Sequence, residues 1–316
     1  MQALYWDGQS LRLDAAYPTP PIEPHTLVIH VRLAGICSTD LQIFQGYMDF
    51  RGVPGHELVG EVCEGPPDLM GVRVVSEINF ACGHCPACAR GLGRHCPTRR
   101  VMGILNADGS FAEYVAVPMA NVHPVPDTVT DEQAVFTEPL AAAFEILEQV
   151  SLQPTDEVLV LGDGKLGVLC AQVLHSAGGR VCVVGKHPGK LQLLHRLGIH
   201  TQSLTDWHPS PVDVVVEATG SPQGLQLAIA AVRPRGKLIL KSTIAAEHAL
   251  SLAPLVINEV TVIGSRCGPF PTALRALARQ HITVTPLIDQ VYPLAAGSEA
   301  VAHAARPGTL KILLAT

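Results

Sequence analysis

The chain has 316 residues, of which 47% are hydrophobic and 16% are charged, with a formal net charge of −6. This length predicts two domains, each large enough to bury its own core. The apolar content is ample and the charged content low, which excludes intrinsic disorder. The acidic balance provides no basic surface for nucleic acid or an anionic membrane, so neither is an expected partner.

Membrane insertion and secretion are also disfavoured. Mean hydropathy is +0.27, yet there is no uncharged apolar run of the ~18 residues that a membrane span requires. The segment MQALYWDGQSLRLD lacks the basic region and apolar stretch of a signal peptide. We therefore expect a cytoplasmic protein.

Short strands dominate the first 130 or so residues. Runs rich in β-branched residues at 27–37, 57–65 and 72–78 are separated by Pro and Gly turns. Helical periodicity follows at 130–150, where Thr130 is the expected N-cap and Gln133 completes a capping-box pattern. The amino-terminal part is therefore expected to be β-rich.

Four of the nine cysteines lie in one segment of this part, with the spacing C-x2-C-x2-C-x7-C. An odd number of cysteines argues against a disulfide framework and for metal or catalytic use. Four thiolates this close can surround one tetrahedral zinc ion, whereas ferredoxin iron–sulfur motifs place the fourth cysteine after three residues. We predict a structural zinc site formed by Cys82, Cys85, Cys88 and Cys96.

Strands and helices alternate after residue 156. We expect strands at 158–161, 180–186, 212–220 and 237–243, and helices at 168–178, 189–199 and 224–236. This alternation predicts an α/β domain with a doubly wound parallel sheet and helices on both faces. A helix at 273–281 and edge-type strands at 291–294 and 309–315 follow. We predict a β-rich domain at 1–140 and 268–316 around a dinucleotide-binding domain at 141–267.

The expected turn after strand 158–161 has the pattern G-x-G-x-x-G. Gly162 suits the tight turn, Gly164 lets backbone N–H groups reach a pyrophosphate, and Gly167 lets the helix pack on the strand. Lys165 and Leu166 lie between Gly164 and Gly167 and are further candidates for contact with the cofactor. Other strand–turn–helix connections also use glycines, but in this context the pattern favours a dinucleotide site.

The next strand ends in Gly185, Lys186 and His187. A carboxylate at this position accepts a hydrogen bond from the ribose 2′-hydroxyl of NAD, and none is present. A lysine here could instead bind the 2′-phosphate of NADP, although loop lysines are often only solvated. We predict NADP(H) rather than NAD(H).

Cys37, His56 and Glu138 each lie at the end of an expected element. A thiolate, an imidazole and a carboxylate that leave one position open make a zinc shell of the catalytic type. Each residue also has a structural interpretation: a small core thiol, a turn histidine and an acid on a helix face. Residue type and position alone leave both interpretations open.

Several segments match a known family in order along the chain. The sequence resembles the zinc-dependent medium-chain alcohol dehydrogenases over essentially its whole length. The resemblance implies a GroES-like catalytic domain joined to a Rossmann domain. The segments that carry it are CSTD, GHELVGEV, the four-cysteine segment, DGSFAEY, TEPLAAA, LGDGKLG, VVVEATG and TLKILL.

The resemblance assigns the catalytic zinc to Cys37, His56 and Glu138, the last bound directly or through water. Glu57 is implied to be the adjacent acid that approaches the metal during ligand exchange. Asp40 resembles the acid that orients the ligand histidine. The Glu-Pro pair at 138–139 is more similar to the polyol and sugar dehydrogenase branch.

Thr39 resembles the hydroxyl that passes the substrate proton outward. The position that often carries a relay histidine is Gln42, which cannot titrate. Thr219 is implied to contact the cofactor, while Arg266 either contacts it or bridges the domains. The side chains that could line a substrate pocket, or simply pack the β-rich domain, are Phe44, Tyr47, Met48 and Phe50.

The sequence thus predicts a zinc-dependent oxidoreductase with two zinc ions per chain. It would transfer hydride between NADP(H) or NAD(H) and a secondary alcohol, polyol or sugar hydroxyl, or the matching carbonyl. Alternatives are a non-catalytic nucleotide-binding protein, an NADPH-dependent aldehyde or ketone reductase, and a zinc-free enoyl or quinone reductase. The expected partners are a small-molecule substrate and further copies of the chain, as a homodimer or homotetramer.

Overall fold

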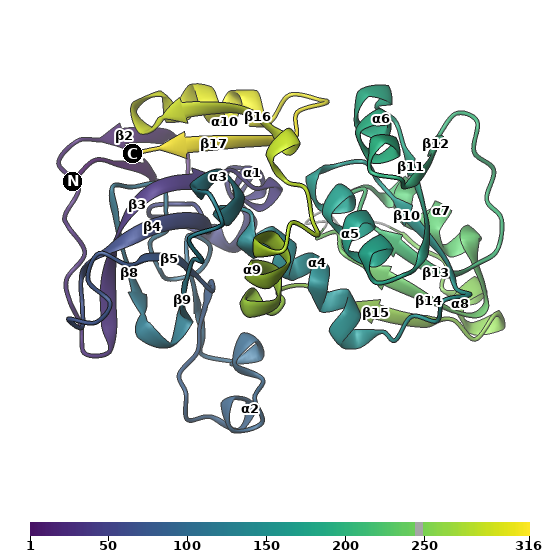
Figure 1. The fold of residues 1–316 in the computed structure, drawn as a ribbon, viewed down its shortest axis with the longest axis horizontal. Coiled ribbons are helices and arrows are strands. Elements are labelled where there is room, and N and C mark those ends of the chain that lie inside the picture. The colour runs from purple at the N-terminus through teal and green to yellow at the C-terminus, as the bar shows by residue number, and fades with distance from the viewer. Residues whose placement is uncertain (244–248) are drawn as a thin grey trace. The chain divides into compact units, whose positions relative to one another are not determined.

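The computed structural model describes residues 1–243 and 249–316 (Figure 1). The chain divides into two compact units. The first comprises Met1–Glu138, Phe270–Arg279 and Val284–Thr316, and the second comprises Pro139–Pro269 and Gln280–Thr283. Within the described residues, no helix is both long and apolar enough to span a bilayer.

The first unit is built on a seven-stranded sheet. Its neighbouring strands are antiparallel except for the parallel pair β16–β17, and β8 (Tyr114–Pro118) pairs with β3. The order is β16 (Ile288–Pro293), β17 (Lys311–Ala315), β3 (Thr26–Gly35), β4 (Glu57–Glu64), β5 (Arg73–Ser76) and β9 (Val122–Pro124).

Short elements complete this unit. Two small sheets pair β1 (Ala3–Trp6) with β2 (Leu11–Asp14) and β6 (Asn79–Phe80) with β7 (Arg100–Val101). The helices are α1 (Ser38–Ile43), α2 (Pro86–Ala89), α3 (Asp131–Ala134), α9 (Phe270–Ala278) and α10 (Gly297–Ala304), and Figure 1 shows α10 beside β16 and β17.

The carboxyl-terminal strand corrects one prediction. We expected residues 309–315 to form an edge strand, but β17 lies between β16 and β3. Ile312, Leu313 and Leu314 are completely buried, so both faces of this strand are covered. The long apolar run is the reason, because interior strands favour continuous hydrophobic sequence.

The expected helix at 130–150 is also interrupted. Thr130 caps α3 through the predicted capping box with Gln133, and a second helix, α4, spans Thr137–Gln149. Pro139 has no backbone N–H and cannot continue a helix from the preceding turn. It therefore lies in the first turn of α4, where the missing donor is tolerated.

The second unit contains a six-stranded sheet in which every pair is parallel. Its order is β12 (His200–Ser203), β11 (Arg180–Gly185), β10 (Glu157–Leu161), β13 (Val212–Glu217), β14 (Val232–Leu240) and β15 (Thr261–Gly264). The connecting helices are α5 (Lys165–Ser176), α6 (Pro188–Arg196), α7 (Pro222–Ala231) and α8 (Ala253–Ile257). This order confirms the doubly wound fold.

Several predicted helix boundaries were wrong, and those of α5 and α7 have a clear physical reason. Helix α5 begins at Lys165, immediately after its N-cap Gly164, because the glycine turn leads directly into it. Helix α7 ends at Ala231 instead of extending to residue 236, and Val232 is already extended. Arg233 precedes Pro234, and a residue before proline disfavours the helical conformation.

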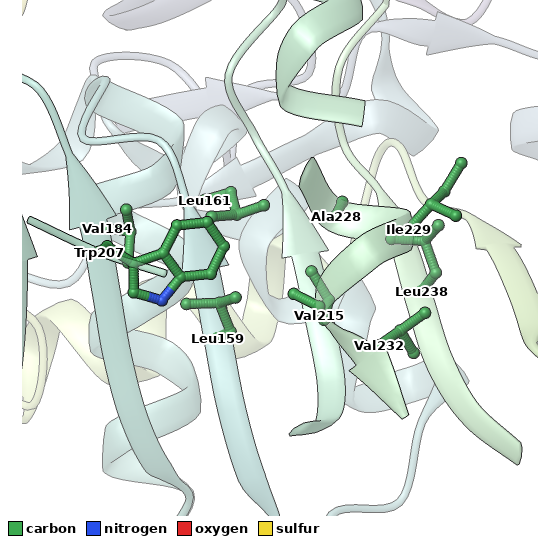
Figure 2. Close-up of a cluster of buried hydrophobic side chains, with 10 residues drawn as sticks. Leu159, Leu161, Val184, Trp207, Val215, Ala228, Ile229, Val232 and Leu238 are labelled. Atoms are coloured by element: carbon green, nitrogen blue, oxygen red, sulfur yellow. The ribbon is translucent and has the colours of Figure 1, made fainter. Parts of the chain in front are cut away.

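Both faces of the parallel sheet are buried. Figure 2 shows Leu159 and Leu161 beside the Trp207 indole and, further along the sheet, Val215 with Ala228 and Ile229 of α7. Val158 and Val160 alternate with the two leucines and therefore point to the opposite face. They are also buried, so the sheet lies between two packed layers.

Candidate zinc and dinucleotide sites

Cys37, His56 and Glu57 meet in the first unit. One ligand atom from each lies within 4.8 Å of the other two. Cys37 is the N-cap of α1, and Glu57 begins β4 directly after His56. Gly55 has a φ of +95° and leaves no room for a Cβ beside Phe111, so glycine is required at this turn.

Asp40 orients two of these residues with one carboxylate. Its Oδ2 accepts a hydrogen bond from the backbone N–H of Cys37 at 2.7 Å, and its Oδ1 lies 3.1 Å from Nδ1 of His56. Because an ionised carboxylate only accepts, Nδ1 carries the proton and Nε2 remains available to a metal. This is the orienting role that the resemblance implied for Asp40.

Charge on His56 is governed by opposing effects. Burial lowers the pKa of His56, but the Asp40 carboxylate and the Cys37 sulfur outweigh it and hold that pKa well above its usual value. His56 is only 3% exposed. The pocket therefore favours a positive charge beside its thiol and carboxylates, as expected for residues that can receive a cation.

Lys311 of β17 forms a buried ion pair with Glu57, a contact that the sequence analysis missed. Nζ of Lys311 donates to Oε2 of Glu57, while Oε1 of Glu57 has no hydrogen-bond partner among residues 1–243 and 249–316. An unpartnered oxygen of a fully buried carboxylate fits a place where a metal or its ligand belongs. A lone lysine in the apolar run TLKILL was the only sequence feature that marked this position.

Two further residues were predicted for this site, Thr39 and Glu138. The Thr39 hydroxyl is 3.9 Å from the Cys37 sulfur. Glu138 lies in the first turn of α4 and is not among the three clustered residues. Its role as a ligand therefore stays a prediction.

The proposed pocket aromatics pack mostly into the protein. Phe50 is buried with Trp6 and Ile43, and Phe44 and Tyr47 pack against that cluster. Met48 differs, because its side chain is exposed and its backbone has a φ of +64°. Of the four candidates, Met48 is therefore the one that faces solvent.

The sulfur atoms of Cys82, Cys85, Cys88 and Cys96 form a second cluster. The Cys85 sulfur lies 3.5 Å from that of Cys88 and 3.8 Å from that of Cys96, and the Cys82 and Cys88 sulfurs are 4.0 Å apart. Four sulfurs at ~2.3 Å from one tetrahedral zinc would be ~3.8 Å apart, so the cluster fits this ion. All nine cysteines of the chain are free thiols.

The glycine turn has the predicted form. Gly162 has a φ of +114°, and a Cβ on Gly167 would lie 2.0 Å from the Gly162 carbonyl oxygen. A Cβ on Gly164 would meet no atom of the described part of the chain within 4 Å, which leaves the start of α5 open to an incoming group. Lys165 and Leu166 are the first residues of that helix, so their backbone N–H groups lie where a phosphate would be met.

The remaining cofactor candidates lie at the carboxyl ends of the parallel strands. Thr219 follows β13 and donates both its N–H and its hydroxyl to Glu217. Gly185 ends β11, and Lys186 and His187 follow it. Arg266 follows β15, and its carbonyl accepts a hydrogen bond from Lys241.

Comparisons with known proteins agree with this architecture. Residues 23–127 match the model of the alcohol dehydrogenase GroES-like domain, and residues 166–280 match that of the zinc-binding dehydrogenase domain. An L-threonine 3-dehydrogenase from Chelativorans sp. is 34% identical over 71% of this chain and 71% of its own length. A sorbitol dehydrogenase from Halalkalibacterium halodurans is 29% identical over 94% of this chain and 93% of its own.

A solved structure shows the same arrangement of elements. A putative zinc-binding dehydrogenase from Sinorhizobium meliloti, bound to NADP, superimposes with a TM-score of 0.89 at 25% identity, covering 100% of this chain and 99% of that one. The chain is therefore a member of the zinc-dependent medium-chain alcohol dehydrogenases, and its relatives over nearly the whole length include polyol dehydrogenases.

Proposed function

We propose that this dehydrogenase transfers hydride between a nicotinamide cofactor and a secondary alcohol, polyol or sugar hydroxyl, or the matching carbonyl. The observation that carries this proposal is the cluster of Cys37, His56 and Glu57 with Asp40 behind it. A protein that only bound nucleotides would need no such cluster. Its residue types also argue against zinc-free enoyl or quinone reduction.

Zinc would be held by Cys37, His56 and Glu138, with Glu57 adjacent, and a second zinc by the four clustered cysteines. When bound at the first site, zinc lowers the pKa of a substrate hydroxyl and polarises a carbonyl. Asp40 keeps the ligand thiol and imidazole oriented, so their geometry is set before substrate arrives.

The protein moves the substrate proton through its own hydroxyls. Thr39 lies beside the Cys37 sulfur, so its Oγ1 can accept the proton of a substrate hydroxyl and donate its own outward. Gln42 cannot titrate and therefore does not continue the relay. We assign the next step to solvent or to a hydroxyl of the cofactor.

The second unit binds the cofactor in this scheme. The N–H groups at the start of α5, beside Gly164, bind the pyrophosphate, and Thr219 and Arg266 contact other parts of the nucleotide. We propose NADP(H) as the preferred cofactor, because no acid ends β11 and the exposed Lys186 follows it. The catalytic domain is assigned to residues 1–140 and 268–316, and the cofactor domain to 141–267.

Metal analysis combined with activity measurements tests the proposal. The purified protein should contain two zinc ions per chain and oxidise members of a polyol panel with growth of the reduced-nicotinamide absorbance. Cys37→Ala and His56→Ala should keep one zinc and lose activity by at least ~10³-fold. Cys63→Ala, a thiol outside both clusters, should keep both zinc ions and full activity.

Two results would contradict this function. One zinc or none in the active wild-type protein would refute the two-site assignment. Nucleotide binding without turnover of any alcohol or carbonyl would favour the non-catalytic alternative. Rates measured in both directions also distinguish a dehydrogenase from an aldehyde or ketone reductase.

We propose that two copies associate along β15, giving a homodimer or, with a further contact, a homotetramer. This strand ends the parallel sheet and exposes Val262, while Val256 and Ile257 of α8 are 75% and 77% exposed. An edge strand with apolar side chains favours pairing with another chain. Val262→Lys should lower the mass measured by light scattering, whereas Leu13→Lys, on another exposed strand, should not.

A cytoplasmic location is the remaining proposal. Its basis is that free cysteines persist in reducing compartments. Fractionation of the source cells, with immunodetection of the chain in the cytoplasmic fraction, tests it.

A further inference from the structure

Asp163 occupies the position between the first two glycines of the G-x-G-x-x-G turn and is only 5% exposed. Its Oδ2 accepts hydrogen bonds from the backbone N–H groups of Lys186 at 2.8 Å and His187 at 2.6 Å. Its Oδ1 lies 3.0 Å from Nδ1 of the His187 ring. One buried carboxylate therefore joins the glycine turn to the turn that follows β11.

Gly185 is the residue that makes room for this carboxylate. A Cβ built on Gly185 would lie 2.5 Å from both Cβ and Oδ2 of Asp163. Any side chain at the end of β11 would therefore collide with Asp163, and an acid there would add charge repulsion as well. The strand therefore ends without an acid because Asp163 fills the space that a side chain at position 185 would need.

The carboxylate also decides what the turn can offer a ligand. The N–H groups of Lys186 and His187 point at Asp163 and are not available to a phosphate. Because Asp163 accepts at Nδ1 of His187, the Nε2 edge of that ring is the one left for a ligand. Lys186 is exposed and His187 is partly exposed, so the turn presents a cationic group and an imidazole.

We propose that Asp163 is a positioning residue that gives this enzyme its selectivity for the 2′-phosphate of NADP(H). It excludes a strand-end acid and holds the turn so that the side chains of Lys186 and His187 bind the phosphate. This inference rests on the NADP(H) preference proposed above. It adds the residue through which that preference is set.

Titration calorimetry with two nucleotide fragments tests this role without any turnover. Adenosine 2′,5′-bisphosphate carries the 2′-phosphate, and 5′-AMP lacks it, so the ratio of their dissociation constants isolates the phosphate subsite. Wild-type protein should bind the bisphosphate at least ~10-fold more tightly than 5′-AMP. Asp163→Ala should remove most of this difference while changing the affinity for 5′-AMP by less than ~3-fold.

Matched variants separate positioning from folding. Asp156→Ala removes another acid of the same unit, whose carboxylate accepts the Gln153 N–H in an exposed turn, and it should leave the ratio unchanged. Asp163→Asn keeps one oxygen for the backbone donors and should give a ratio of dissociation constants between those of wild type and Asp163→Ala. If the alanine variant fails to fold, the asparagine variant provides the test. Gly185→Asp should abolish binding of both fragments, and adding Asp163→Ala to it should restore 5′-AMP binding.

The outcomes distinguish this inference from the proposed function. If Asp163→Ala weakens both fragments equally, or leaves the ratio at its wild-type value, Asp163 has only a structural role and the inference is overturned. If wild-type protein itself does not prefer the bisphosphate, the proposed NADP(H) preference is wrong and the inference fails with it. Both results are binding measurements, so they do not depend on the zinc content or the catalytic activity of the protein.

Discussion

Replacing Lys311 with methionine should destabilise the zinc-site unit by about 3–5 kcal/mol. The Lys311 and Glu57 side chains are 1% and 0% exposed, and Nζ of Lys311 also lies 5.6 Å from the centroid of the Phe136 ring. Methionine fills a similar volume but leaves the Glu57 carboxylate in the interior without its cation. The penalty is large because that carboxylate has little else to compensate its charge.

Ionisation of Lys311 is required for this magnitude. Burial alone lowers the pKa of Lys311, but the nearby Glu57 and Cys37 groups outweigh it and raise that pKa above its usual 10.5. The ion pair therefore persists throughout the neutral range. At ~2–4 °C per kcal/mol for a domain of ~150–250 residues, the melting transition of this unit should fall by about 10 °C.

Scanning calorimetry of the zinc-free protein measures this shift, because a cation bound beside Glu57 would itself compensate the carboxylate. Arg32→Met is a matched control, because it breaks an ion pair with Asp131 in which the arginine is 44% exposed, and it should cost less than about 1 kcal/mol. The double variant Glu57→Met with Lys311→Met removes both buried charges and should recover most of the lost stability. The reasoning is refuted if Lys311→Met costs no more than Arg32→Met, or if the double variant is as unstable as the single one.

Thiol reactivity and acid stability provide two more predictions. In zinc-free protein near neutral pH, iodoacetamide should modify Cys82, because the backbone N–H of His84 lowers the pKa of Cys82 to about 6. Zinc should protect Cys82, whereas Cys170, whose burial raises its pKa to about 11, should stay unmodified in both forms by peptide mass spectrometry. The backbone N–H of Glu157 and a neighbouring guanidinium lower the pKa of Asp213 from 3.8. Asp213→Asn should therefore melt at a lower temperature than wild type above pH 3.8, and this difference should disappear as the pH falls below that value. A difference that does not change with pH would contradict the prediction.

Local sequence patterns were sufficient to predict most of the parallel sheet. The buried run at 158–161 is followed directly by the glycine turn and the next helix. The residues that interact in this unit therefore lie within about twenty positions of one another in the sequence. The spacing of the four cysteines was equally local, since their sulfurs meet within one loop. Local patterns of this kind predict their conformation because few other conformations are compatible with them.

Pairs that are distant in the chain were not predictable in this way. Lys311 and Glu57 are separated by 254 residues, and nothing beside either one identifies its partner. Asp163 was similarly treated as a variable position of the glycine pattern, although its carboxylate reaches the next strand. In both cases a residue's role depends on which strands become neighbours, and hydrophobic periodicity does not encode that order for polar groups.

Asp40 and Asp163 show that the two sites share one physical device. Each buried carboxylate accepts a backbone N–H with one oxygen and faces Nδ1 of a histidine with the other. Each therefore fixes a turn and a ring orientation together, and leaves the Nε2 edge of the histidine for a ligand. The difference lies in solvent access: His56 is 3% exposed, which suits a dry metal site, whereas the His187 side chain is 40% exposed, which suits exchange of a charged nucleotide. Under the proposed function, the same local chemistry serves metal binding in one unit and reversible cofactor binding in the other.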